Sequence, residues 1–594
     1  MTTPKTKDGR TRGNGLRISG SYRGKEKELL VLGCSMTKRE SRGKLPAIDR
    51  YDGPAYRVLR GYLRQNQWPT TLSVAVLSAE HGLFGGLKQI KTYNKLMTEV
   101  RAKKWAPICG STLRNWAESH DRIHLALGKD YLPAVQETVE GDLKGKARVL
   151  KGPIGMKLHQ VKELLEGTRS AKRTTPDLEA GTGQVKYFLP DWDDLLDPEF
   201  DFKEDRFSGK TRAERKDKHC CVLMQPERMC DGVLVSLAQH VTSKGPLRRI
   251  EGTELNSLAP LPLRDQFGLG SDQWMFGDCG AFSYVNEVSP AISVEQAVSL
   301  YELHGFDFGA SVDHIPVKEV VRDGERVALT EGQRRHRVFR TRENAERFIN
   351  LVRDRRAGFT PVGTIQALSP SGYAATAQHY FDLGYRHIAI GGLVPKQDKD
   401  IEQIVEAVVE AADDLTSRMW IHVFGVFRPK LQERFRELRI DSFDSATYFR
   451  KAWLRSDQNY LARNGQWYAA IRVPMTSDGR TKNRLEMGVQ EQESLEAEEA
   501  HVLRLLNDYD QGAASLESVL DAVLAYDSHL TRSSDSNPMR DAYRKTLKDK
   551  PWTTCGCPFC KAVGIHMLLF RGSNRNKRRG AHNTLMLYDS VRCL

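Results

Sequence analysis

The feature that most constrains the fold is a regular alternation, from Cys220 onward, of short apolar runs with amphipathic segments of helix length. Buried parallel strands read as short apolar runs, and a helical crossover must separate each from the next. The alternation therefore predicts an α/β fold closed as a (β/α)8 TIM barrel, with a doubly wound open sheet as the alternative. The apolar runs are CCVLMQ, VLVSL, WMFGD, FDFGASVD, PVGTIQ, HIAIGG and WIHVFG, and the expected helices cover residues 293–304, 341–354, 371–383 and 400–413.

Polar residues follow these apolar runs at the positions where active sites of barrels lie. Asp278, Asp313, Gln366, Gly392 and Asp444 each come at or after the end of a run. Active sites of TIM barrels are built at the C-terminal strand ends, so this placement favours the barrel over the open sheet. A single acid at such a position is more often a helix cap than a catalyst. Three carboxylates facing one site nevertheless predict acid–base chemistry.

The small residues after Asp278 also suggest how a ligand approaches. In Asp278-Cys-Gly-Ala-Phe282 the backbone is accessible to a planar molecule, and Phe282 could stack on it. We therefore expect a planar ligand at this strand end.

Cysteines near the C-terminus predict a metal site. Cys555, Cys557 and Cys560 lie within six residues, and His582 or His566 could complete a tetrahedral Cys3His zinc site. With four protein ligands the Zn²⁺ would be structural. The alternative is three unrelated free thiols.

The chain as a whole is basic, and one segment is especially so. Lys and Arg number 90 against 76 Asp and Glu, a formal charge of +14, which favours a polyanionic partner. Guanidinium groups bind phosphates bidentately, so a cluster near the zinc ligands predicts a clamp for a nucleic-acid backbone, with a solvated basic loop as the alternative. The cluster comprises Arg571, Arg575, Lys577, Arg578 and Arg579.

Composition also bounds the compartment. We find neither a signal-peptide core nor a run of about 18 apolar residues, so we expect a cytoplasmic protein that does not enter a membrane. Ten cysteines are few for a disulfide scaffold of this length.

Shifts in composition divide the chain. Residues 25–150 predict a small α/β accessory domain with strands near 28–33 and 73–78, and mixed Gly, Pro, acidic and basic residues suggest a linker at 151–219. The complete division is a disordered basic arm at 1–24, the accessory domain at 25–150, an irregular linker at 151–219, and a barrel at 220–594 that contains a helical insertion at about 464–550 and a zinc subdomain at 551–594.

Several motifs together resemble those of tRNA-guanine transglycosylases. They are the CxCxxC motif with the later His582-Asn583, the Asp-x-Gly-x-Phe segment from Asp278, the Gly391-Gly392-Leu393 turn and Phe443-Asp444-Ser445. Their order along the chain agrees with that family, and the zinc motif, which favours His582 over His566, is the most specific. The resemblance covers roughly residues 220–594.

This resemblance implies base exchange by double displacement at an anomeric carbon. Asp444 would be the nucleophile and Asp278 the general acid and base. Asp313 and Gln366 match base-recognition positions, and backbone N–H groups near Gly391 to Leu393 would bind the base carbonyl.

The chain also departs from the pattern of the tRNA enzymes. Cys279-Gly280-Ala281 replaces a Ser-Gly-Gly sequence, His314 follows Asp313, and Ala367 follows Gln366. The segment RGSNRNKRRGAHN resembles relatives that insert 7-deazaguanines into DNA. We therefore expect a 7-deazaguanine such as preQ0 to replace guanine in DNA, with tRNA as the alternative substrate and a silent nucleic-acid-binding subunit as the alternative role. Other DNA-modification proteins and a second copy of the chain are candidate partners.

The amino-terminal module resembles an uncharacterised domain with a CSxxK start and an AEHG strand end. Here these are Cys34-Ser-Met-Thr-Lys38 and the segment around His81. A turn of this kind could hold a phosphate, with Lys38 and Arg57 as charge partners and His81 lining the same site. An accessory domain without activity is the equal alternative.

Overall fold

The computed structural model describes residues 26–593, apart from 42, 169–179, 183, 192–193, 239–257, 261–262, 414–416, 455–456, 478–488 and 532–537. The arm expected at residues 1–24 lies outside the described residues. Within the described ranges no helix has both the length and the apolar character needed to cross a membrane.

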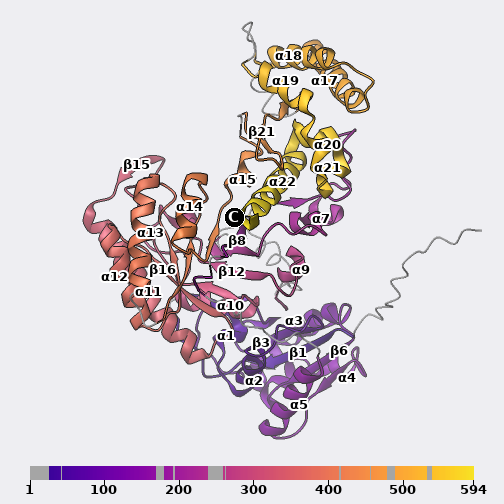
Figure 1. The fold of residues 1–594 in the computed structure, drawn as a ribbon. Coiled ribbons are helices and arrows are strands. Elements are labelled where there is room, and N and C mark those ends of the chain that lie inside the picture. The colour runs from indigo at the N-terminus through magenta and orange to yellow at the C-terminus, as the bar shows by residue number, and fades with distance from the viewer. Residues whose placement is uncertain are drawn as a thin grey trace, which may run out of the picture.

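Eight parallel strands form a closed barrel, which confirms the predicted barrel and excludes the open sheet. Every neighbouring pair is parallel, including the pair of β19 with β8 that closes the ring (Figure 1). In order around the barrel the strands are β11 (Gly232–Ser236), β12 (Trp274–Asp278), β13 (Phe308–Ala310), β16 (Thr360–Ile365), β17 (His387–Ile390), β18 (Trp420–Val423), β19 (Ser442–Asp444) and β8 (Lys186–Pro190).

Two sequence-based assignments near the start of the barrel were wrong. The strand β8 lies inside residues 151–219. We interpreted that range as a linker because the few apolar residues of the strand stand next to many acidic residues in the sequence. The run CCVLMQ is not a strand but forms α7 (Cys220–Met224), whose first turn is capped by the His219 side chain accepting from Cys221 N. The barrel therefore begins at Lys186 rather than at Cys220.

Helices surround the barrel, and its strands separate an inner core from an outer one. Aromatic residues from the strands, among them Phe188, Phe276, Phe308 and Trp420, fill the interior. A larger core lies between the strands and the helices. The main helices are α10 (Val294–Leu303), α11 (Glu331–Arg355), α12 (Pro370–Asp382), α13 (Asp398–Asp413) and α14 (Pro429–Glu437). α11 begins earlier than expected because Thr330 and Gln333 form a capping box. A hairpin of β14 (Glu319–Arg322) and β15 (Glu325–Ala328) precedes this helix.

The amino-terminal domain is a five-stranded sheet in the order β4-β3-β1-β6-β7. Alternate side chains of its strands enter two cores, one under α2 and α5 and the other under α3 and α4. α5 lies inside the supposed linker but packs on α2, so the domain extends beyond residue 150. The elements are β1 (Glu28–Gly33), α2 (Pro54–Leu63), β3 (Leu72–Ser78), β4 (Gly82–Gly85), α3 (Glu99–Ala117), β6 (Arg122–Ala126), α4 (Gln136–Glu140), β7 (Ala147–Val149) and α5 (Ile154–Gly167).

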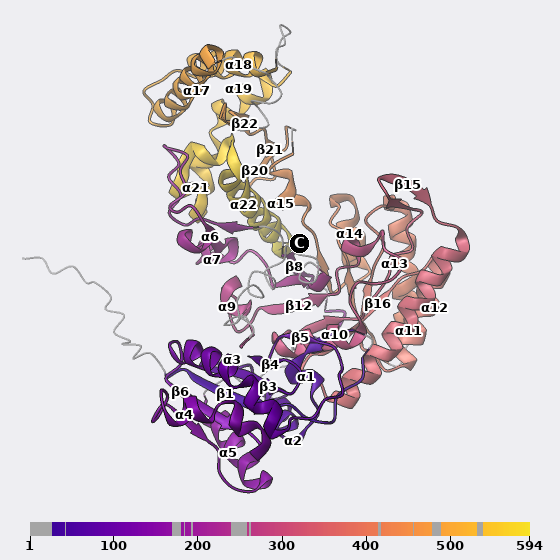
Figure 2. The ribbon, with the colours of Figure 1, turned by 180° about the vertical axis from the view of Figure 1, so that it is seen from behind.

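The carboxyl-terminal region is helical and lies on a different side of the barrel from the amino-terminal domain (Figures 1 and 2). The helical insertion contains α17 (Val489–Asp510), α18 (Leu516–Thr531) and α19 (Arg540–Asp549). Two short helices, α20 (Pro551–Cys555) and α21 (Pro558–Val563), precede the long helix α22 (Gly572–Cys593), which contacts α15 (Thr447–Lys451) just after the last barrel strand.

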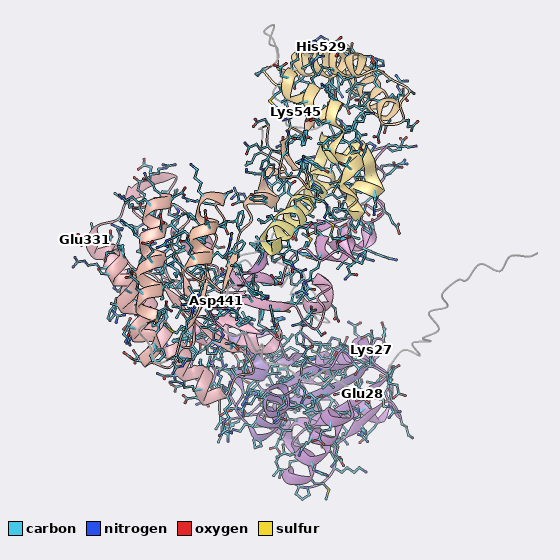
Figure 3. The ribbon with its side chains drawn as sticks, viewed as in Figure 1. Lys27, Glu28, Glu331, Asp441, His529 and Lys545 are labelled. Atoms are coloured by element: carbon cyan, nitrogen blue, oxygen red, sulfur yellow. The ribbon has the colours of Figure 1, made fainter. Side chains whose placement is uncertain are left out.

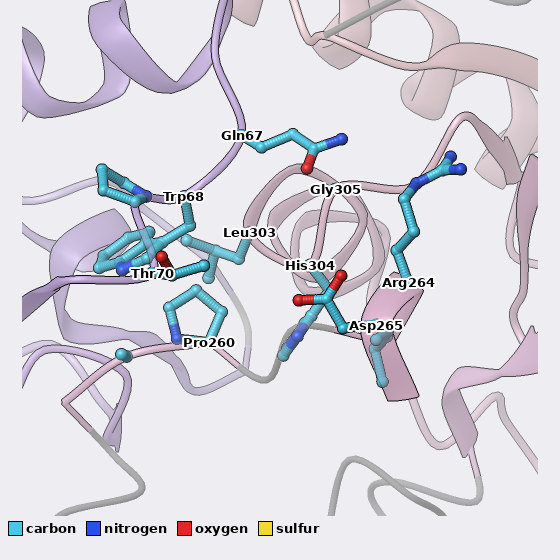
Figure 4. Close-up of a pocket in the computed structure, with 12 residues that line it drawn as sticks. Gln67, Trp68, Thr70, Pro260, Arg264, Asp265, Leu303, His304 and Gly305 are labelled. Carbon is cyan, nitrogen blue, oxygen red and sulfur yellow. The ribbon is translucent and has the colours of Figure 1, made fainter. Parts of the chain in front are cut away.

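The amino-terminal domain packs against the barrel directly. Val74 N of β3 donates to Leu258 O at 2.7 Å, and Leu303 of α10 joins the core under α2. Nη1 of Arg355, at the end of α11, lies 3.9 Å from Oδ2 of Asp49 in the amino-terminal domain. A cavity of about 140 Å³ remains between the two domains, lined by Trp68, Pro260, His304 and others (Figure 4).

Candidate active site

The barrel places the predicted site residues at one end of its strands. Asp278 and Asp444 are the last residues of β12 and β19. Gln366 directly follows β16, Gly391 directly follows β17, and Asp313 follows β13 by three residues. Because the strands are parallel and closed into a ring, their carboxyl ends meet at the same face.

The opposite end of the last strand carries a carboxylate with a structural role. Asp441 lies among the barrel strands (Figure 3) and accepts backbone N–H groups from Ile421 at 2.7 Å and from Gly181 at 2.5 Å. Burial raises the pKa of Asp441 to about 6. Of the two acids in Asp441-Ser-Phe-Asp444, only Asp444 therefore lies at the end of the strand where chemistry is expected.

Asp313 is the centre of a buried hydrogen-bond network. The Cys279 thiol donates to its Oδ1 at 2.8 Å, and Gln366 Nε2 donates to its Oδ2 at 2.7 Å. Tyr284 OH donates to the Asp313 carbonyl at 2.9 Å. This network fixes the orientation of the Asp313 carboxylate, and the cysteine that departs from the family pattern is part of it.

The Gly391-Gly392 turn is shaped by the Gln366 side chain. A Cβ at Gly391 would lie 2.3 Å from Gln366 Nε2, and one at Gly392 would lie 2.6 Å from Gln366 Oε1. Gly392 also has a φ of +73°, which favours glycine. Gln366 Oε1 is buried and accepts no hydrogen bond within the described part of the chain. The two glycines thus bring the backbone next to an amide oxygen that can still accept.

Asp278 has the electrostatic surroundings of a group that exchanges protons near neutral pH. Burial raises its pKa to about 7, with further contributions from the nearby Asp313 and Asp444 carboxylates. Backbone N–H groups of Gly280 and Cys279 oppose this shift without cancelling it. Asp278 is therefore protonated in a large fraction of molecules at pH 7, and it can both give and accept a proton.

Asp444 is held by two donors on one oxygen. Gly425 N donates to its Oδ1 at 2.8 Å, and His422 Nε2 lies 3.2 Å from the same atom. His422 Nδ1 lies 2.7 Å from Ser442 Oγ, and burial lowers the pKa of the imidazole, so a neutral ring can accept from Ser442 and donate to Asp444. Within the described residues Oδ2 has no hydrogen-bond partner. One carboxylate oxygen is anchored and the other is available for reaction.

His422 lies at this site and was not predicted by the sequence analysis. It lies in the middle of the apolar run WIHVFG and is fully buried against the rings of Phe276 and Phe424. Its polarity inside a buried strand was the available signal, because a buried imidazole needs hydrogen-bond partners. Cys279 and Tyr284 were missed as network members for lack of any comparable signal.

Phe282 follows Asp278 in the turn η4 (Ala281–Tyr284), and 55% of its surface is exposed. Its ring is therefore accessible to a ligand, as the stacking hypothesis requires.

The four predicted metal ligands come together. His582 Nδ1 lies 3.5 Å from the Cys555 and Cys557 sulfurs and 3.7 Å from that of Cys560, and all four residues are buried. His582 Nε2 lies 2.8 Å from Leu461 O, so it carries the proton and leaves Nδ1 as the ligand atom. His566 instead contacts Arg575. The donor set can hold a metal ion and fits Zn²⁺.

The predicted backbone clamp is wrong for the four arginines. Arg571 and Arg575 pair with Asp205, and Arg571 also bonds Glu499 at 2.6 Å. Arg578 and Arg579 donate to main-chain oxygens of Asp197 and Ala452. All four are at most 5% exposed, so their guanidinium groups cannot reach a phosphate. Lys577, which is less buried, contacts Leu195 O at 3.3 Å. The acidic segment that we interpreted as a linker is the partner of this basic one.

Comparison with known proteins identifies two relatives. No family model matches the chain. A DNA-guanine transglycosylase of Salmonella montevideo is 33% identical over 413 residues, which cover 69% of this chain and 97% of that protein. A tRNA-guanine(15) transglycosylase of Methanococcus aeolicus is 25% identical over 199 residues, which cover 33% of this chain and 29% of that protein. The chain therefore belongs to the DNA-modifying branch of the guanine transglycosylase superfamily, and it is a glycosyltransferase that acts on guanine in nucleic acid.

Proposed function

We propose that this enzyme replaces guanine in DNA with a 7-deazaguanine such as preQ0, through a covalent intermediate on Asp444. The observation that carries the proposal is the pairing of two unlike carboxyl groups. Asp444 has one anchored and one free oxygen, and Asp278 has a pKa of about 7. Two carboxyl groups with different protonation preferences are the usual requirement for retaining displacement at an anomeric carbon.

In the first displacement Asp444 Oδ2 attacks C1′ as the bond from C1′ to N9 of guanine breaks. The Asp278 carboxyl gives its proton to the departing guanine, which leaves neutral, and the deoxyribose remains esterified to Asp444. In the second displacement Asp278 takes a proton from the incoming 7-deazaguanine. The N9 of that base then attacks C1′ and releases the Asp444 carboxylate. Two inversions return the new base to the original face.

Recognition of the base falls to the residues around Asp313. Its carboxylate and the buried Gln366 Oε1 can accept from N–H groups of a guanine-like ring, and the backbone N–H groups from Gly391 to Leu393 can bind the base carbonyl. Phe282 offers an exposed ring for stacking. A site that recognises the features shared by guanine and 7-deazaguanine suits both half-reactions.

The Cys3His group would hold a structural Zn²⁺ through Cys555, Cys557, Cys560 and His582. Bound zinc would fix α20, α21 and α22 relative to each other, and with four protein ligands it has no position left for substrate. The chemistry therefore rests on the carboxylates.

DNA is favoured over tRNA as the substrate by the comparisons. The DNA-guanine transglycosylase aligns along 97% of its length, whereas the tRNA enzyme aligns along 29%. Base exchange in a duplex requires the target nucleotide to leave the stack, so proteins that open or bend DNA, or a second copy of this chain, are suitable partners.

The test is nucleoside mass spectrometry of DNA and of tRNA from cells that make this protein and are supplied with preQ0. We expect a modified deoxyguanosine in DNA, which disappears with Asp444→Ala and with Asp444→Asn. Denaturing electrophoresis should also show a covalent adduct of DNA with the wild type and none with either variant.

Other outcomes would replace the proposal. A modified ribonucleoside in tRNA alone would make tRNA the substrate. Binding of DNA without an adduct or modification, even with partner proteins from the same cells, would indicate a silent nucleic-acid-binding subunit.

A further inference from the structure

The strands and connections of the amino-terminal sheet are arranged as in open parallel sheets that bind ligands at one edge. Strands β1, β3 and β6 are parallel and end at the same edge, at Gly33, Ser78 and Ala126. The connection after β1 leads to α2 on one face, and the connection after β3 leads to α3 on the other. In open α/β sheets, ligands bind beyond the carboxyl ends of strands whose connections diverge in this way.

A lysine without an acidic partner lies at this edge. Lys38 Nζ is 4.5 Å from the centre of the Tyr93 ring and 5.8 Å from that of Tyr51. It donates to the loop carbonyl of Ser35 at 3.1 Å, and within the described residues no carboxylate forms an ion pair with it. Partial burial lowers the pKa of Lys38. The ammonium is thus partly desolvated and not neutralised.

Three hydroxyl groups form a network beside this lysine. Tyr51 OH lies 2.6 Å from Tyr93 OH, which lies 2.8 Å from Ser78 Oγ, and Tyr51 also interacts with Ser78. Ser78 Oγ accepts backbone N–H groups of Glu80 and His81. Tyr51 and Ser78 are fully buried, whereas Tyr93 is half-buried, so Tyr93 is the member of the network whose hydroxyl a ligand can reach.

Arg57, expected as a second charge partner, does not serve that purpose, since it pairs with Asp52 at 3.0 Å. The His81 ring instead packs edge-on against Tyr93. The thiol of Cys34 lies at the same edge, 3.1 Å from Tyr131 OH.

We propose that this edge is a second ligand site, separate from the barrel, at which Lys38 and the Tyr93 hydroxyl bind a phosphate group. A partly desolvated ammonium without an acidic partner among the described residues, beside a hydroxyl that a ligand can reach, calls for a ligand that carries negative charge and accepts hydrogen bonds. Phosphate offers several such oxygens to donors from different elements. The phosphate can belong to a free nucleotide or to a DNA strand.

Cys34 provides a local reporter for the test. Among the described cysteines it is the one that is not buried, so iodoacetamide should alkylate it first. We would measure the rate of Cys34 alkylation in the folded full-length protein by peptide mass spectrometry. The added ligands are inorganic phosphate, deoxyguanosine monophosphate, or a DNA oligonucleotide with or without a 5′-phosphate, each compared with chloride at equal ionic strength.

Phosphate ligands should slow alkylation of the wild type at least threefold, and calorimetry should show their affinity falling about tenfold or more with Lys38→Gln. Tyr93→Phe, which removes only the hydroxyl, should weaken binding less. Lys103→Gln is the matched control, because this lysine belongs to the same domain but pairs with Glu99 on an exposed helix face. Circular dichroism establishes that each variant is folded.

The pattern of protection by the added ligands distinguishes the two sources of phosphate. Protection by the monophosphate and by the 5′-phosphorylated strand alone would assign a terminal phosphate. Equal protection by both strands would assign the backbone. Absence of protection by every ligand, or equal affinities for Lys38→Gln and Lys103→Gln, would overturn the proposal. Neither readout depends on base exchange.

Discussion

At the scale of single residues, Asp278 determines how the reaction should respond to pH. Its pKa of about 7 leaves it protonated below neutrality and ionised above. Departure of guanine needs the protonated form, so we expect the single-turnover rate of adduct formation to fall as pH rises through about 7. The measurement is a pH profile of adduct formation with the wild type; a flat profile between pH 6 and 8 would exclude Asp278 as the acid.

The same shift predicts an opposite effect on stability. A carboxyl whose pKa is raised in the folded state lowers the stability of the fold progressively as pH rises from its ordinary pKa of about 4 to the raised value of about 7, and the loss is complete above that. Asp278→Asn should therefore abolish turnover and yet raise the melting temperature relative to the wild type at pH 8. The difference in melting temperature should shrink progressively as the pH falls toward about 4, the ordinary pKa of an aspartate.

His422 should act by positioning Asp444. His422→Ala removes one of two donors to Asp444 Oδ1. We expect kcat to fall about 10- to 100-fold with little change in KM, because one charge-assisted hydrogen bond contributes about 1.5–3 kcal/mol. His387→Ala is the matched control, since His387 is another histidine of the barrel strands that packs on Phe308 and Trp420 but, among the described residues, does not hydrogen-bond to Asp444. Equal losses in both variants would mean that His422 only fills the core.

Sequence alone could predict the site residues whose position is fixed by a strand end. Asp278, Gln366 and Asp444 were found because each closes an apolar run, and the closed ring brings them together. Residues whose role depends on a distant partner could not be found this way. Arg575 looked like a phosphate ligand because its partner, Asp205, is 370 residues away in the chain.

At the scale of elements, α22 is fixed by ion pairs that can be tested directly. Arg575→Met leaves the largely buried Asp205 carboxylate with Arg571 as its one charge partner among the described residues. We expect the free energy of unfolding to fall by about 3–5 kcal/mol, measured by urea denaturation. Lys577→Met, on the same helix, should cost much less. If Arg575→Met weakened DNA binding without loss of stability, the clamp hypothesis would have to be restored.

The metal group should hold the same region together. The wild type should contain one zinc ion per chain by elemental mass spectrometry, and Cys557→Ser should contain much less. Loss of zinc should lower the melting temperature, because burying thiols without a metal leaves α20, α21 and α22 tied only by packing. Ser590→Ala, at the far end of α22, is the control. Full metal content in the Cys557 variant would show that the ion binds elsewhere.

Element boundaries were predictable where capping and periodicity agreed. α10 begins after Ser293 as expected, because Ser293 and Gln296 form a capping box at the start of an apolar pattern. β8 was hard to recognise because acidic residues follow it in the sequence, and one of them, Asp205, pairs with Arg571 and with Arg575 of α22. A strand is thus hard to recognise in a sequence when the residues next to it form ion pairs with a different element.

At the scale of the whole molecule, the chain combines a base-exchange enzyme with additional structure. The DNA-guanine transglycosylase aligns with 69% of this chain along almost its entire own length. Two separate cores support the amino-terminal sheet, and among the described residues Leu258 and Leu303 are the buried apolar ones that join them from the barrel. The accessory domain is therefore built as a unit of its own, with its own candidate site.

The closure of the barrel by β8 and β19 also has a consequence for biosynthesis. The amino-terminal domain can fold soon after α5 leaves the ribosome. β8 is synthesised next, but β19, the strand with which it closes the barrel, follows much later. The segment after β8 pairs with Arg571 and Arg575, which are synthesised later still. The nascent barrel must therefore remain open, with apolar strand edges exposed, at least until Asp444 has been synthesised. Chaperone demand should be concentrated in that interval, while the first domain is already folded.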